Sequence, residues 1–138
     1  MIQSYILLGT LGVHSMEDVR DRKITVTVTL FSGILGVLLH LFFPQRSIFE
    51  MLAGVLSGAG MVLFGRLTGG KIGMGDGIVL MLTGLYLGAA DNLLLMCISF
   101  LLAGVWGIFL LVLDCGQRNR RIPFVPFLFV GYLLMIIG

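Results

Sequence analysis

Long apolar runs alternate with short polar connections along the whole chain. Each run is continuous rather than alternating, which argues against strands, because an isolated apolar segment in lipid must satisfy its own backbone hydrogen bonds. The pattern predicts six helices. A bilayer span takes about 20 residues, so the short first and last runs are expected to continue into the interface. The six runs are Ile2–Met16, Ile24–Phe43, Ile48–Phe64, Ile72–Ala90, Leu93–Leu113 and Ile122–Ile137.

The composition identifies the environment of these helices. Of the 138 residues, 58% are hydrophobic and 12% are charged, whereas a soluble domain carries about 25% charged residues. So few charged side chains cannot cover a water-soluble globule, and so much hydrophobicity excludes disorder. The net charge of +2 does not indicate a nucleic-acid-binding protein. The sequence therefore predicts an all-α membrane protein with a single polytopic domain over residues 1–138.

The basic residues predict the orientation. With six spans, the first, third and fifth loops share one side of the membrane, and the other side holds only Arg46. Because cytoplasmic loops carry the excess of Lys and Arg, these three loops are expected in the cytoplasm and both termini outside a plasma (inner) membrane. The N-terminal run lacks a basic flank and a small-residue cleavage pattern, so a removable signal peptide is not expected. The basic residues of the three loops are Arg20, Arg22, Lys23, Arg66, Lys71, Arg118, Arg120 and Arg121.

The glycine pair, the cysteines and the histidines do not indicate a catalytic group or a metal site. Gly54 and Gly58 form a small-xxx-small pair, for which packing within one chain is the favoured interpretation and a homodimer face the alternative. Cys97 and Cys115 lie 18 residues apart on one predicted helix, about 27 Å, which is too far for a disulfide. With two cysteines and two distant histidines, the sequence predicts no metal site and no cofactor.

Two acidic residues lie where apolar runs reach the predicted cytoplasmic side. Asp18 belongs to a cluster of three acids and three bases between Glu17 and Lys23, which could simply anchor the helix to anionic lipid. Asp76 follows the glycine-rich stretch 69–75. Such backbone at membrane depth is tolerated only where protein buries it or it lines a wet cavity, and an ionisable residue there indicates function. A flexible loop with an ordinary interfacial aspartate is the alternative.

Two carboxylates brought together at this boundary would share a proton, because like charges close together do not both ionise readily. One could then deprotonate a water while the other protonates a carbonyl oxygen or a leaving amine. This is the chemistry of an aspartic protease, and it requires no nucleophilic side chain, metal or cofactor. The sequence leaves open whether the two residues meet.

Three segments resemble the type IV prepilin peptidases, membrane aspartic peptidases that carry a Gly-x-Gly-Asp motif. They are residues 18–24, which open on Asp18, residues 73–76, which end on Asp76, and residues 121–127, with the pattern basic-x-Pro-Phe-x-Pro-Phe. The resemblance implies that Asp18 and Asp76 form the catalytic pair, with Asp21 as the alternative first member. Residues that it implies to shape the site or contact substrate are Gly73, Gly75, Pro123, Phe124 and Pro126. The prolines could instead simply start a helix, with Phe124 and Phe127 as interfacial anchors.

The resemblance also implies a substrate. It is the short basic leader of type IV prepilins or related pseudopilin-like precursors, cut at the cytoplasmic face, where Glu17, Asp21 or Asp114 could attract it. The chain departs from the family pattern at Thr25-Val26, where Pro-Asn or Pro-Asp is frequent, and at Ile78, where many members have Lys. It lacks the N-terminal region of the long members, so a short-form peptidase without methyltransferase activity is expected. The expected partners are prepilin-like proteins and the lipid bilayer, with a homodimer allowed. A non-enzymatic scaffold or degenerate peptidase homologue of a pilus or secretion system is the alternative.

Overall fold

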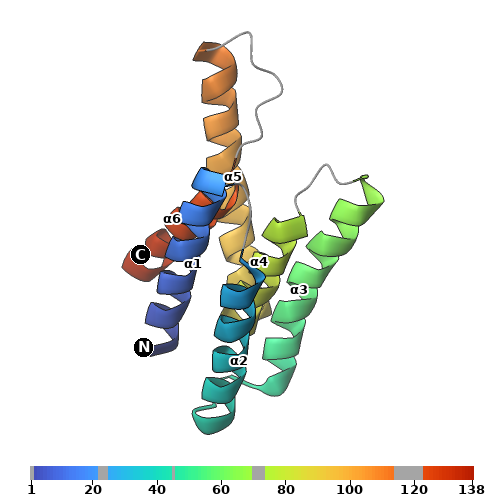
Figure 1. The fold of residues 1–138 in the computed structure, drawn as a ribbon, viewed down its shortest axis with the longest axis vertical. Helices are drawn as coiled ribbons and strands as arrows, with labels where there is room; N and C mark the ends of the chain where they lie inside the picture. Colours follow the sequence, from blue (N-terminus) through green and yellow to red (C-terminus); the bar gives the residue numbers. More distant parts are fainter. Residues whose placement is uncertain (1, 22–24, 45, 70–73, 114–122) are drawn as a thin grey trace.

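The computed structural model describes residues 2–21, 25–44, 46–69, 74–113 and 123–138, and these residues form six α-helices without a strand. In Figure 1, α1, α3 and α5 run in one direction and α2 and α4 in the other, so that α1 ends and α4 begins at the same end of the molecule. The all-helical prediction is confirmed. The helices are α1 (Ile2–Asp21), α2 (Val26–Phe42), α3 (Ile48–Leu67), α4 (Met74–Leu87), α5 (Ala89–Leu113) and α6 (Val125–Ile137).

Several helix boundaries differ from the hydropathy pattern, and the ends of α1 and α4 do so for local reasons. Helix α1 continues five residues beyond the predicted Met16, to Asp21, because charged side chains do not interrupt the backbone hydrogen bonds of a helix. Helix α4 ends at Leu87, since Gly88 has φ 82°, a left-handed conformation that glycine adopts without steric cost. Helix α5 starts immediately afterwards, so the fourth apolar run is shorter as a helix than as a sequence pattern.

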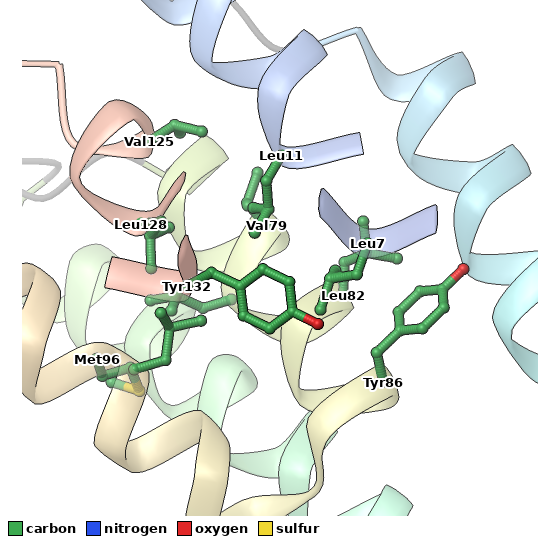
Figure 2. Packing of buried hydrophobic residues seen from close by; sticks show 11 residues of the cluster. Leu7, Leu11, Val79, Leu82, Tyr86, Met96, Val125, Leu128 and Tyr132 are labelled. Carbon is green, nitrogen blue, oxygen red and sulfur yellow. The ribbon is translucent and has the colours of Figure 1, made fainter. Parts of the chain in front are cut away.

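A single hydrophobic core lies between four of the six helices, α1, α4, α5 and α6 (Figure 2). Its fully buried members include Leu7 and Leu11 of α1 and Val79 and Leu80 of α4. The outward side chains are mostly apolar as well: Phe31 of α2, for example, is 70% exposed. Several polar side chains are buried instead, and they are Thr10, His14, Asp18, Thr29, Ser32, Thr83, Asn92 and Ser99.

This distribution is that of a membrane protein. Helices α3 and α5 are each long and apolar enough to cross a membrane, and α2, α6 and most of α4 are shorter apolar helices. Because lipid solvates apolar side chains, an apolar exterior is favourable there, while polar groups pair with one another inside.

The closest helix pair is held together by glycine. A Cβ atom on Gly58 would lie 2.5 Å from the Cα of Met81, and one on Gly54 would lie 2.8 Å from the carbonyl carbon of Gly84. Backbone atoms of α4 already occupy the places that these Cβ atoms would take. Helices α3 and α4 therefore approach more closely than they could if a residue with a Cβ atom stood at either position. Gly54 and Gly58 therefore pack α3 against α4 within one chain, as the favoured interpretation predicted, and this face is not open to a second copy.

Candidate active site

Asp18 lies on the buried face of α1, near the end of that helix. It is spaced 4 and 7 residues from His14 and Leu11, which places all three on one side of the helix, and only 8% of its surface is exposed. Asp21, in contrast, is exposed at the last residue of α1. Asp21 is therefore on the surface of the protein, whereas Asp18 is buried in it.

The carboxylate of Asp18 is held by the start of α6. The backbone N–H of Val125 donates a hydrogen bond to its Oδ2 at 3.2 Å. In this first turn Pro126 has no N–H, and the N–H of Phe127 donates to the Phe124 carbonyl at 3.0 Å. The Val125 N–H therefore has the Asp18 carboxylate as its partner. The third sequence segment therefore contributes a backbone donor to the first.

Pro123, Phe124 and Pro126 are half-buried around this contact. The prolines lie at the start of α6, as the helix-start interpretation predicts. The Phe124 ring packs against Phe100 of α5, with ring centroids 4.9 Å apart, so it contributes to packing between helices. Substrate contact by Phe124 or the prolines remains a prediction.

Asp76 lies in the first turn of α4 and is half-buried, as is Gly75 before it, while Gly73 lies outside the described residues. Helix α4 contacts α1, and Leu11 of α1 shares the hydrophobic core with Val79, which is three residues beyond Asp76 on the same face of α4. The structure therefore packs together the two helices that carry Asp18 and Asp76, with both residues toward the same end (Figure 1).

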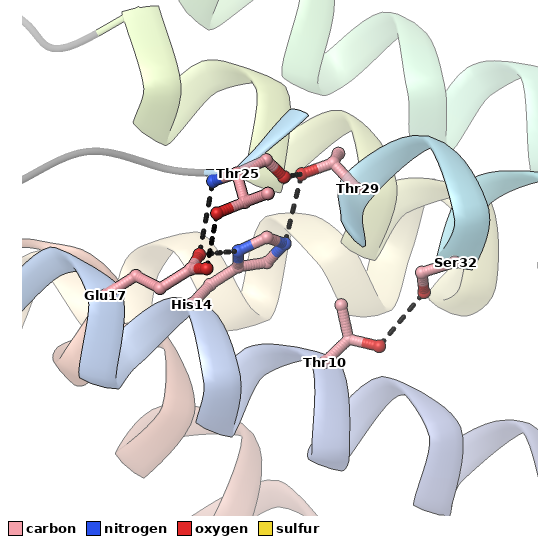
Figure 3. A network of polar contacts seen from close by, with 6 residues as sticks. All are labelled: Thr10, His14, Glu17, Thr25, Thr29 and Ser32. Atoms are coloured by element: carbon pink, nitrogen blue, oxygen red, sulfur yellow. Dashed lines mark hydrogen bonds and ion pairs between the residues drawn. The ribbon is translucent and has the colours of Figure 1, made fainter. Parts of the chain in front are cut away.

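A closed ring of hydrogen bonds, which we call the Glu17 ring, joins the end of α1 to the start of α2 (Figure 3). Glu17 Oε2 lies 3.0 Å from His14 Nδ1 and accepts from the Thr25 N–H at 3.2 Å, and Glu17 Oε1 accepts from the Thr25 hydroxyl at 2.5 Å. His14 Nε2 lies 3.1 Å from the Thr29 hydroxyl oxygen, and that hydroxyl lies 3.2 Å from the Thr25 carbonyl. The hydrogen bond from the Thr25 hydroxyl holds the pKa of Glu17 below its usual value, against the opposing effect of burial.

The Glu17 ring was not predicted from the sequence. The available signal was the helical spacing that puts a histidine one turn before Asp18 and a glutamate beside it, but their partners on α2 could not be inferred. The ring also bears on the leader peptide, because the Glu17 carboxylate already has three donors. Of the acids proposed to attract a basic leader, Asp21 is exposed and Asp114 lies outside the described residues.

Further polar contacts connect α2 to α1 and α4 away from the Glu17 ring. The Thr10 and Ser32 hydroxyls lie 3.0 Å apart, and the Tyr86 hydroxyl of α4 donates to the Ser32 carbonyl at 2.6 Å.

Among the described ranges, no three His, Cys, Asp or Glu side chains are grouped as metal ligands would be. The chemistry that this arrangement supports is acid–base chemistry by carboxyl groups.

Comparison with known proteins agrees with this geometry. A model of the type IV leader peptidase family matches residues 5–108, which include both candidate aspartates. Comparison with curated proteins and with solved structures gives no match for this chain.

Proposed function

This chain belongs to the type IV leader peptidase family, and on that premise we propose that it is an aspartic endopeptidase with Asp18 and Asp76 as its water-activating pair. The observation that carries the proposal is the hydrogen bond from Val125 N–H to Asp18. It joins two of the three segments that resemble the prepilin peptidases, residues 18–24 and residues 121–127. The remaining segment ends on Asp76 in the first turn of α4, and α4 contacts α1.

The proposed reaction needs one ionised and one protonated carboxyl group. We assign the role of base to Asp18, which accepts a hydrogen bond from the Val125 N–H, and the role of acid to Asp76. Asp18 removes a proton from water as the water oxygen bonds to the scissile carbonyl carbon, and Asp76 protonates the carbonyl oxygen. The tetrahedral intermediate then collapses: the C–N bond breaks, the amine takes a proton from Asp18, and the released carboxyl product returns a proton to Asp76.

The proposed substrates are type IV prepilins and pseudopilin-like precursors, whose short basic leader is removed at the cytoplasmic face. The asymmetry of basic loops in the sequence supports six spans with both termini outside a plasma membrane, and this orientation places the Asp18 and Asp76 ends of α1 and α4 in the cytoplasm. Exposed Asp21, one turn beyond Asp18, is the described acid best placed to attract a basic leader.

A cleavage assay in liposomes tests the proposal. Wild type is expected to cut at least one member of a panel of prepilin-like peptides, and neither Asp18→Asn nor Asp76→Asn should cut it, because each lacks one ionisable group but keeps the shape of the side chain. Asp91→Asn is the matched control, since Asp91 is half-exposed in an ion pair with Arg46 at the start of α5. Normal cleavage by either catalytic variant refutes the assignment, and no cleavage by folded wild type favours the scaffold alternative.

A further inference from the structure

We propose that the Glu17 ring is a positioning device for Asp18, with Glu17 and His14 as positioning residues of the peptidase. This inference rests on the proposed catalytic role of Asp18. Glu17 precedes Asp18 directly, and His14 lies one turn before it on the same buried face of α1. The ring therefore acts on the two turns of helix that determine where the Asp18 carboxylate points.

The end of α1 needs such support. The helix ends at Asp21, three residues after Asp18, and the last carbonyl groups of a helix have no partner within it, so helix ends fray. The ring fixes this end by joining Glu17 and His14 to Thr25 and Thr29 of α2. The ring consequently fixes the residues next to Asp18, while the Asp18 carboxylate accepts a hydrogen bond from Val125 of α6.

Both nitrogens of the His14 side chain take part in the Glu17 ring. A carboxylate only accepts hydrogen bonds, so His14 Nδ1 is assigned as the donor to Glu17. Nε2 lies 3.1 Å from the Thr29 hydroxyl oxygen, whose own proton is donated to the Thr25 carbonyl. His14 is fully buried, and both of its nitrogens have partners. Loss of Glu17 or Thr29 would therefore leave a nitrogen of buried His14 unpaired, which native proteins avoid.

Thr25 shows that the ring acts between helices. Thr25 is the N-cap residue of α2, but its side chain makes no capping hydrogen bond to that helix. Its hydroxyl donates to Glu17 instead. A residue type that usually stabilises its own helix is here directed at the neighbouring one, toward the residue beside Asp18.

The test uses the full chain in liposomes and a prepilin-like peptide that wild type cuts. Thr25→Val removes the hydroxyl with little change of shape, Thr25→Ser keeps it, and Glu17→Gln weakens the centre of the ring. Glu50→Gln, on the exposed first turn of α3, is the control for loss of an acid elsewhere. Asp18→Asn is measured in parallel, and kcat and KM are determined separately for protein shown to be folded by its melting curve.

A displaced Asp18 should slow the chemical step rather than weaken binding. We expect Thr25→Val and Glu17→Gln to lower kcat about 10- to 100-fold with KM changed less than about twofold, while Thr25→Ser and Glu50→Gln keep kcat near the wild-type value. The inference is overturned if Thr25→Val and Glu17→Gln keep wild-type kcat while Asp18→Asn is inactive. It is also overturned if Thr25→Ser loses as much as Thr25→Val. Cleavage by Asp18→Asn would instead refute the proposed catalytic role of Asp18, and with it the proposed function.

Discussion

Replacing Gly58 with alanine would place a methyl group inside the backbone of α4. The new Cβ would lie 2.5 Å from the Cα of Met81 and 2.6 Å from the carbonyl carbon of Leu80, whereas carbon atoms in contact are separated by about 3.5 Å or more. Both neighbours are backbone atoms and cannot rotate away. Helices α3 and α4 would therefore have to move apart by about 1 Å at this point.

The displacement should affect both stability and activity. Overpacking of this kind costs about 1–3 kcal/mol, which a gain in helix propensity of at most about 1 kcal/mol would only partly offset. Helix α4 also carries Asp76, and a misplacement of about 1 Å in a catalytic site can reduce the rate about 100-fold. Gly58→Ala is therefore expected to lower the melting temperature and to reduce kcat by about one to two orders of magnitude.

Gly60→Ala is the matched control, because Gly60 lies two residues along the same helix with no atom within 4 Å of its added Cβ. It should leave cleavage unchanged and stabilise the helix by up to about 1 kcal/mol. Thermal melting in detergent and peptide cleavage in liposomes measure the two effects. Equal melting temperatures and equal rates for Gly58→Ala and Gly60→Ala would refute the described packing of α3 on α4.

Two further predictions concern the polar groups. Because the Thr25 hydroxyl lowers the pKa of Glu17 from its usual 4.5, ionised Glu17 contributes stability that is present above the unfolded pKa and lost as the pH falls through the lower folded pKa. The melting temperature of wild type should therefore fall more steeply than that of Glu17→Gln below about pH 4.5; parallel curves would contradict this. Asn92→Leu should destabilise the protein by about 1–2 kcal/mol, since buried Asn92 makes hydrogen bonds between helices, including one of 2.7 Å to Ser57 of α3. Ser99→Ala, which loses only a bond within α5, should change melting little, and equal losses for the two would argue against the role of Asn92.

The sequence was informative wherever the determinants are local. Continuous apolar runs predicted the six helices, the Gly54 and Gly58 spacing predicted a close helix contact, and the prolines predicted the start of α6. Hydropathy was less reliable at boundaries. It ended the first helix at Met16, because it registers the change from apolar to charged side chains and not the backbone hydrogen bonds that continue to Asp21.

The contacts of the candidate site depend on residues far apart in the chain. Val125 binds Asp18 across 107 positions, and no local pattern specifies such a pairing. His14 was interpreted only as one of two distant histidines without a metal site, since its partner Thr29 belongs to another helix. Thr25 departs from the pattern of the prepilin peptidases, and the structure shows that its hydroxyl and N–H both bind Glu17.

The central claim is that Asp18 and Asp76 act as one water-activating pair, and a double-mutant cycle on the rate of peptide cleavage tests it most directly. Asp18→Asn, Asp76→Asn and the double variant would be compared with wild type under single-turnover conditions. If the residues act as a unit, each single change removes about 10²- to 10⁴-fold of the rate and the double variant is no slower than either. Losses that multiply in the double variant, or a single variant that cleaves at the wild-type rate, would contradict the claim.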